Sequence, residues 1–324
     1  MPTAVVWREG ESTPVEVQFG RENRVFVNAY TAEVLGTGSV AMRGFFRQMT
    51  DWHRWLAAKG DTRDLGKSVT GAANLAFLLI VLSGMWLWWP RNLTWASIRS
   101  VSWFRRGLAG KARDFNWHNV IGFWSAIPLV IVVASGVVIS YPWASALVFR
   151  MVGEPPPARA AAGPSPGAAA GRSEGGRSEG GRSEGRGGEV RVALAGALES
   201  RLLVAKAQMP DWRTISLTLP TKPNADASFS LDRGMGGEPH KRATAVITTE
   251  GQVAELQSFA SQSPGRRLRS ILRFAHTGEV LGAFGQTLAG LISLGSAVLV
   301  FTGIALSFRR LRAWLRRRSA PSPA

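Results

Sequence analysis

Three long apolar segments constrain this chain more than any other feature of its sequence. Residues 68–89, 119–141 and 280–308 contain no Asp, Glu, Lys or Arg. Each has the roughly 20 apolar residues needed to cross about 30 Å of hydrocarbon, and each is longer than an ordinary buried core helix. The sequence therefore predicts a membrane protein of mainly α-helical class. The predicted transmembrane helices are residues 68–90, 117–142 and 279–308.

Basic residues set the expected orientation of these helices. The segments 91–116 and 309–324 are rich in Arg and Lys and carry a single acid, Asp114. Loops of this kind stay in the cytoplasm, so we expect the N-terminal region and residues 143–279 on the outer side of a bacterial inner membrane. The formal net charge of +17 then reflects topology and contact with anionic lipid. We expect no nucleic-acid partner, because no basic face carries a recognised reading motif.

The N-terminal region raises a difficulty for this topology. Residues 1–67 are assigned to the outer side, yet no apolar segment precedes them. The simplest explanation is an additional N-terminal helix lost through a misplaced start or truncation.

The parts outside the membrane are expected to be of several kinds. Residues 1–43 are expected to hold a β-hairpin, because residues 15–19 and 24–28 alternate apolar and polar side chains. Residues 44–67 suggest an amphipathic helix at the membrane surface. Residues 153–189, with three copies of Gly-Arg-Ser-Glu-Gly, have the composition of a disordered linker. Residues 190–270 then predict a small α+β domain, with one helix covering strands near 215–219, 227–231 and 244–248.

Four histidines are present, and three of them lead into a predicted span. His53 precedes the first span, His118 begins the second and His276 precedes the third, whereas His240 lies in a Gly/Pro-rich turn and is expected to be solvated. A histidine at a membrane boundary often simply reaches water, and three in this position make a shared ligand role a second interpretation beside that one. With no cysteine in the chain, bis-histidine haem is a more natural occupant than zinc.

The predicted topology divides these histidines between the two faces of the membrane. His53 and His276 fall on the outer face, where they are candidates to ligate one haem iron, and His118 falls on the cytoplasmic face without a partner. Arg54 and Arg273 lie beside the outer histidines and are candidate partners of haem propionates, although interfacial anchoring explains them equally well. A weak repeat of Ser/Thr-Gly in the spans, at residues 83–84, 135–136 and 302–303, also allows close helix packing.

Together, these motifs resemble the PepSY-associated transmembrane family, which includes iron-regulated membrane proteins and ferric-siderophore reductases. The likeness covers most of the chain apart from the linker. It is carried by Trp52-His-Arg-Trp-Leu56, the stretch from Leu82 to Arg91, Trp117-His-Asn-Val-Ile-Gly122, His276-Thr-Gly-Glu279 and the hairpin residues 25–36. The family typically has four spans, the first with a histidine near the cytoplasmic side, and this sequence lacks that span.

The resemblance implies a haem b protein that carries electrons across the membrane to a ferric complex, such as a ferric siderophore, with an unidentified electron donor. In enzyme terms this is a haem-dependent ferric reductase. The implied ligands are His53 and His276 for an outer haem and His118 for half of an inner site. The alternative is a membrane-anchored PepSY binding or regulatory module without redox activity. Transport is disfavoured because the spans lack residues that relay ions.

Overall fold

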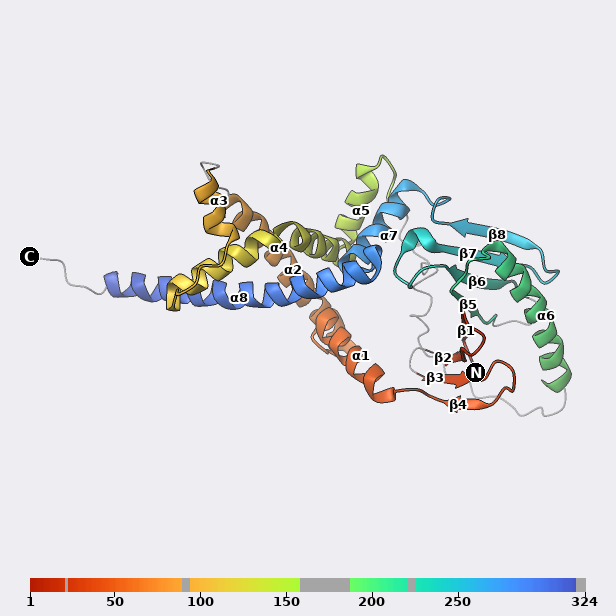
Figure 1. Cartoon of the computed structure of the whole chain (residues 1–324). Coiled ribbons are helices and arrows are strands. Elements are labelled where there is room, and N and C mark those ends of the chain that lie inside the picture. Colours follow the sequence, from red (N-terminus) through yellow and green to blue (C-terminus); the bar gives the residue numbers. More distant parts are fainter. Residues whose placement is uncertain (21–22, 89–93, 158–186, 221–224, 319–324) are drawn as a thin grey trace, which may run out of the picture. The chain divides into compact units, whose positions relative to one another are not determined.

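The computed structural model describes residues 1–20, 23–88, 94–157, 187–220 and 225–318 (Figure 1). Most of the predicted linker, residues 158–186, and the end of the predicted C-terminal tail, residues 319–324, lie outside this set. The chain divides into two compact units, and each is taken by itself below. One unit comprises residues 1–53 and 145–271, and the other comprises residues 54–144 and 272–324.

The second unit is a helix bundle whose centre is one long helix. Its helices are α2 (Arg63–Trp88), α3 (Trp95–Ser102), α4 (Gly110–Ser140) and α8 (Gly282–Arg318), with short 3₁₀ turns η1 (Gly60–Thr62) and η5 (Glu279–Leu281) before α2 and α8. Helix α4 packs against both α2 and α8. Leu129, Val133 and Ile292 form the buried centre of this packing. Apolar side chains of all three helices therefore meet along α4.

Three helices in the described residues are long and apolar enough to cross a membrane, as the sequence predicts. Each helix extends beyond its apolar run. Helix α4 begins at Gly110, within the segment predicted as the basic loop, and α8 continues to Arg318, within the predicted C-terminal tail. Lys and Arg are good helix formers, so the helix can continue where the hydrocarbon ends.

Four further helices have most or all of their residues in the first unit. They are α1 (Val40–Trp55), α5 (Pro142–Met151), α6 (Gly187–Gln208) and α7 (Pro264–His276). Helix α1 is shorter than the predicted segment 44–67. It ends at Trp55 because Leu56 and Ala57 have positive φ angles of 55° each, which no α-helix can accommodate.

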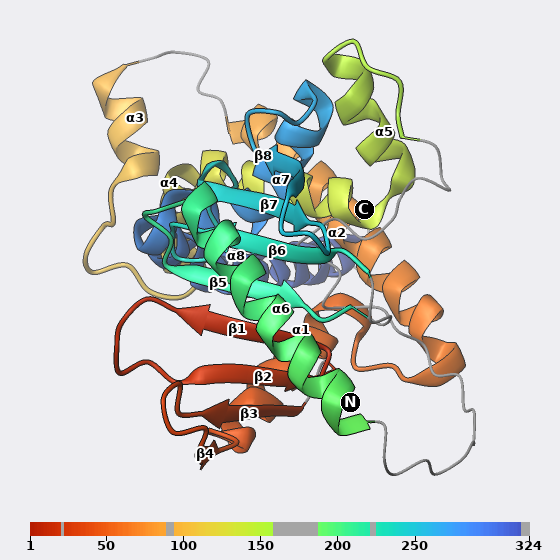
Figure 2. The same ribbon diagram turned by 90° about the vertical axis from the view of Figure 1, so that its right-hand side faces the viewer.

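The first unit contains an antiparallel sheet built from two distant parts of the chain (Figure 2). Its strands are β1 (Ala4–Arg8), β2 (Val15–Phe19), β3 (Asn23–Val27), β4 (Val34–Gly36), β5 (Thr214–Thr218), β6 (Ala227–Asp232), β7 (Arg242–Ile247) and β8 (Val253–Ser258). A 3₁₀ turn, η4 (Pro239–Lys241), precedes β7. The strand order is β4-β3-β2-β1-β5-β6-β7-β8. The predicted N-terminal hairpin and the predicted α+β domain therefore share one sheet.

The junction between the two parts is the pairing of β1 with β5. Its register runs from Ala4 opposite Thr218 to Arg8 opposite Thr214. The sequence analysis found β2, β3 and β5 to β7 but not β1. Alternation alone does not reveal that β1 joins a partner about 210 residues away, because strand pairing depends on contacts that no local pattern encodes.

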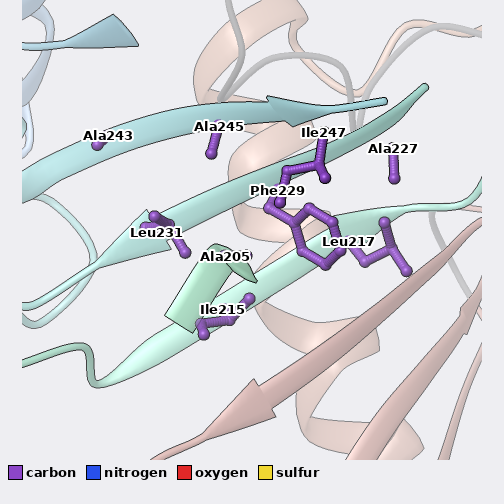
Figure 3. Close-up of a cluster of buried hydrophobic side chains, with 9 residues drawn as sticks. All are labelled: Ala205, Ile215, Leu217, Ala227, Phe229, Leu231, Ala243, Ala245 and Ile247. Carbon is purple, nitrogen blue, oxygen red and sulfur yellow. The ribbon is translucent and has the colours of Figure 1, made fainter. Parts of the chain in front are cut away.

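The core of this unit lies between the sheet and α6 (Figure 3). Ile215, Leu217, Phe229 and Leu231 are fully buried, while Ser216 and the other residues between them face the opposite side. This alternation is the period of two that a half-buried strand requires. Helix α6 covers β6 and β7, as predicted for this domain.

A buried carboxylate ties the N-terminal strands together. Glu16 on β2 accepts hydrogen bonds from Arg8 on β1 at 2.9 Å and from Gln18 at 2.8 Å, and pairs with Arg24 on β3 at 2.9 Å. Burial by itself raises the pKa of Glu16, but the hydrogen bonds from Gln18 and Arg8 and the charges of both arginines outweigh it, so the pKa is lowered.

We expect this carboxylate to make the N-terminal half of the sheet acid-sensitive. Because the folded-state pKa of Glu16 is lowered, its stabilisation is present above the unfolded-state value of about 4.5 and is lost as pH falls through the lower folded value. Amide hydrogen exchange in β1 to β3, measured on a falling pH series, should show the loss. In Glu16→Gln the exchange should already be faster at neutral pH and should lose this pH dependence. An unchanged acid response in that variant would contradict the assignment.

Candidate functional site

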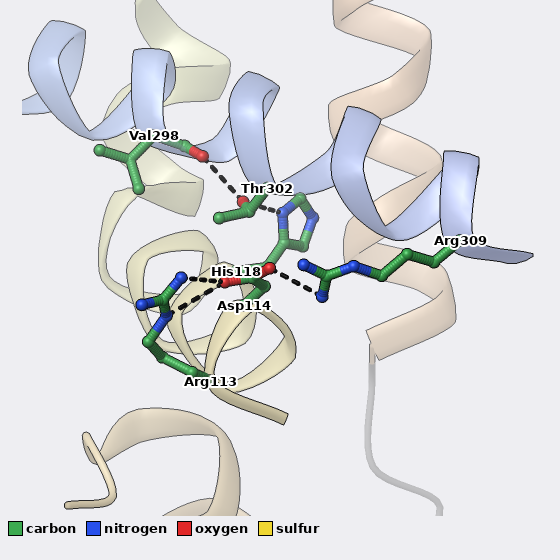
Figure 4. Close-up of polar contacts among 6 residues, drawn as sticks. All are labelled: Arg113, Asp114, His118, Val298, Thr302 and Arg309. Carbon is green, nitrogen blue, oxygen red and sulfur yellow. Dashed lines mark hydrogen bonds and ion pairs between the residues drawn. The ribbon is translucent and has the colours of Figure 1, made fainter. Parts of the chain in front are cut away.

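His118 lies near the start of α4 and is held by α8 (Figure 4). Its Nδ1 is 2.9 Å from Oγ1 of Thr302, and that hydroxyl donates its proton to the carbonyl oxygen of Val298 at 2.8 Å. A hydroxyl has a single proton, so the Thr302 oxygen accepts a hydrogen bond from Nδ1–H. With the Thr302 hydroxyl donating to Val298, the neutral imidazole of His118 carries its proton on Nδ1 and a lone pair on Nε2.

The His118 ring also lies beside Gly303, the residue after Thr302. A Cβ atom on Gly303 would stand 3.4 Å from Cε1 of His118, which is ordinary van der Waals contact. The ring therefore packs directly on the backbone of α8, and any longer side chain at this position would have to share its space. Thr302 itself is only 2% exposed, so water does not compete for its hydroxyl.

An ion-pair cluster one helical turn before His118 fastens α4 to α8. Asp114 is buried, and its carboxylate accepts from Arg113 at 3.1 Å and pairs with Arg309 of α8 at 2.9 Å (Figure 4). A buried carboxylate is tolerated only when it is paired in this way. The sequence analysis noted Asp114 as the only acid of its segment but assigned it no role. Its isolation among basic residues was the available signal.

His276 ends α7 and contacts the opposite part of α4. Its Nδ1 is 2.8 Å from the carbonyl oxygen of Val132 and 3.4 Å from Oγ of Ser135. Ser135 donates its own proton to that same carbonyl at 2.8 Å. Because a carbonyl oxygen only accepts, Nδ1 of His276 must carry the proton in this contact. His276 therefore has the same tautomer as His118, with the lone pair on Nε2.

Gly136 makes room for this histidine and for a polar side chain from α2. A Cβ atom on Gly136 would come within 2.9 Å of Nδ2 of Asn74 and 3.1 Å of Cε1 of His276, so one or both would have to move. Asn74 donates from Nδ2 to the carbonyl oxygen of Val133 at 3.1 Å. Helices α2, α4 and α7 therefore converge at Gly136. The sequence analysis missed Asn74, although an amide within an otherwise apolar run was a signal.

The two histidine sites lie at opposite ends of α4. His118 and Gly136 are 136 − 118 = 18 residues apart, which corresponds to about 27 Å along a helix. One iron cannot be ligated by both His118 and His276 over this distance.

The Ser/Thr-Gly repeat acquires a structural meaning at both sites. Ser135-Gly136 receives His276, and Thr302-Gly303 receives His118. The third copy behaves differently. Ser83 bonds the carbonyl of Ile80 in its own helix, and nothing in the described part of the chain lies within 4 Å of a Cβ placed on Gly84.

The other predicted site residues are distributed between the two units. His53 is exposed on α1 and belongs to the unit that contains the sheet, whereas His276 belongs to the helix bundle. Pairing of His53 with His276 on one iron therefore stays a prediction. The Arg54 guanidinium lies 4.5 Å from the ring centroid of Trp55, and that of Arg273 lies 5.5 Å from the ring of Phe274. These contacts fit interfacial anchoring, and a role with propionates also stays a prediction.

Both the sheet and the apolar helices agree with one known family. Its sequence model, described as the PepSY-associated TM region, matches residues 2–310. The chain belongs to the PepSY-associated TM family. The match includes both units, so the strands β1 to β8 and the three spans are parts of one family pattern, and the chain is a membrane protein in contact with the bilayer. No curated protein matches the sequence significantly.

Haem at the histidine sites stays a prediction, and the residues that surround these sites are compatible with it. Among the described residues no three His, Asp or Glu side chains gather closely enough to hold an ion by themselves. Haem iron takes four ligands from the porphyrin and needs only one or two from the protein, usually imidazole nitrogens. A histidine whose Nδ1–H is bonded to an oxygen, as in His118 and His276, is oriented for ligation through Nε2.

We expect Thr302 to determine the tautomer of His118. Thr302→Val keeps the shape but removes the acceptor of Nδ1–H, whereas Thr302→Ser retains it. Loss of one buried hydrogen bond is worth about 1 kcal/mol, a change of roughly fivefold in the tautomer ratio. Imidazole ¹⁵N chemical shifts of labelled protein in detergent should show the Nδ1–H form in the wild type and in Thr302→Ser. In Thr302→Val both tautomers should be present. A wild-type ring protonated on Nε2 would overturn the assignment.

Proposed function

We propose that this protein binds haem b in the bacterial inner membrane and carries electrons across it to a ferric complex outside the cytoplasm, as a ferric-siderophore reductase does. One observation carries the proposal: two histidines with the same anchored tautomer lie at opposite ends of one membrane-spanning helix. His118 and Gly136, which lies against the His276 ring, are about 27 Å apart along α4, close to the thickness of the hydrocarbon core. A haem at each end of α4 would therefore divide electron transfer across the membrane into shorter steps.

The protein residues in this proposal act by holding and orienting. His118 is the ligand of an inner haem, and His276 with His53 are the ligands of an outer one. Thr302 holds Nδ1–H of His118, and the Val132 carbonyl holds that of His276, so that each Nε2 is presented in a single direction. Haem, when bound, supplies the one-electron chemistry. Arg54 and Arg273 are the proposed propionate partners.

Charge asymmetry supports the orientation in this proposal. The α3–α4 segment and the end of α8 are strongly basic, and both lie at the His118 end of the bundle because Arg309 pairs with Asp114. By the positive-inside rule this end faces the cytoplasm, which leaves the sheet unit outside. Electrons would then enter at His118 from a donor still to be identified and leave at His276 toward the ferric complex.

Absorption spectra of purified protein test the proposal. After haem-replete expression we expect a Soret band and, from the proposed bis-histidine outer site, the sharp α-band of six-coordinate low-spin haem on reduction. His118→Ala and His276→Ala should each remove part of the bound haem, and the double variant should remove nearly all of it. His240→Ala is the matched control, since His240 is exposed in a turn, and its spectrum should equal that of the wild type.

The same experiment separates the proposal from its alternative. If the protein is a membrane-anchored PepSY binding module, the wild type should show no Soret band above the His118→Ala/His276→Ala background. Equal haem content in the wild type and the double variant would contradict the assigned ligands even if haem is bound. His53→Ala tests the remaining ligand, with loss of low-spin character at one haem as the expected result.

A further inference from the structure

The loop between α3 and α4 is hydrogen-bonded to α4 through the buried side-chain amide of Asn116. Asn116 is 5% exposed, and it donates from Nδ2 to the carbonyl oxygen of Trp103 at 3.2 Å and accepts from the backbone N–H of Arg105 at 3.0 Å. Trp124 of α4 adds a bond from Nε1 to the carbonyl of Ser102 at 3.0 Å. Three hydrogen bonds from α4 therefore hold residues 102–105 in a defined shape at the His118 end of the bundle.

This folded connection forms a small hollow with an aromatic side and a basic side. It is lined by Ser102, Trp103, Phe104, Arg105, Arg106 and Trp124. The aromatic rings remain largely uncovered: Trp103 is 60% exposed, Phe104 53% and Trp124 64%. Aromatic side chains left open next to an apolar run are typical of the membrane–water boundary, where one side meets lipid and the other meets water.

The two arginines of the hollow have no counter-charge from the protein. Both are exposed, and neither forms an ion pair within the part of the chain that the structure describes. Asp114 is the only acid between residues 65 and 153, and Arg113 and Arg309 already bind its carboxylate. The Arg105 and Arg106 side chains therefore present unbalanced positive charge beside exposed aromatic rings.

We infer that this hollow binds an anionic phospholipid, with the headgroup phosphate at Arg105 and Arg106 and the glycerol and first acyl carbons over Trp103, Phe104 and Trp124. Guanidinium groups bind phosphate through charge-assisted hydrogen bonds, which explains the arginines. A free phosphate ion would leave the aromatic rings without a role. An amphipathic lipid contacts both the arginines and the aromatic rings. The hollow lies beside the apolar part of α4, so bilayer lipids can reach it.

Native mass spectrometry of the full chain in detergent tests the inference by titration with phosphatidylglycerol or phosphatidylcholine of identical acyl chains. We expect at least one tightly retained phosphatidylglycerol and weaker binding of phosphatidylcholine. The double substitution Arg105→Gln/Arg106→Gln should lower the affinity for phosphatidylglycerol by about 25-fold, roughly fivefold for each arginine. Both positions are exposed, so the variant should keep the wild-type fold.

Two further variants separate a built site from general attraction. Arg316→Gln/Arg317→Gln removes the same charge from α8, about 10 Å beyond Arg309 along the helix, and should leave the retained lipid in place. Asn116→Ala keeps every charge but frees the loop, and should weaken binding toward the level of the Arg105/Arg106 variant. Equal loss in both arginine variants would show diffuse attraction only and overturn the site. Equal binding of inorganic phosphate with loss of lipid preference would also overturn it.

Discussion

The helix bundle depends on one constraint: within hydrocarbon, a polar side chain must find its partner in the protein. At one end of α4, Asp114 pairs with Arg309 and His118 contacts Thr302, both on α8. Further along α4, Asn74 of α2 bonds the Val133 carbonyl and His276 bonds the Val132 carbonyl. Since no water replaces a lost partner there, each of these bonds also selects how the helices pack. The polar contacts thus add specific points of attachment between α4 and its neighbours α2 and α8.

The same contacts explain why the histidines are suited to ligation. A histidine satisfied only by water could rotate or exchange tautomers, and neither state would present a fixed nitrogen. His118 is held by a threonine that is itself committed to Val298, and His276 is held by the Val132 carbonyl. The His276 ring also needs Gly136, where a Cβ atom would come within 3.1 Å of Cε1, whereas a Cβ atom on Gly303 would make only ordinary contact with His118. The repeated small-polar–glycine pair therefore serves helix packing and imidazole orientation together, so the two interpretations of this repeat are compatible.

The sheet unit follows a different principle. Its stability comes from an apolar layer between α6 and the strands, and its continuity comes from β1, which joins β2 on one side and β5 on the other. Segments that lie on opposite sides of two spans in the sequence are thereby combined in one sheet. Each half of the sheet also contains a buried carboxylate in an ion pair, Glu16 with Arg8 and Arg24 in the N-terminal strands and Asp232 with Arg242 across β6 and β7.

By itself, the sequence determined the three spans, the basic ends, the membrane class and the strands β2, β3 and β5 to β7, because these depend on local hydrophobicity, charge and period. It also singled out His118 and His276 as candidates. Only the tertiary structure decided which atoms hold these rings, that Asn74 and Asp114 belong beside them, and that β1 completes a continuous sheet. These features are contacts between residues far apart in the chain, and local patterns carry no information on which distant partner satisfies a buried polar group or a strand edge.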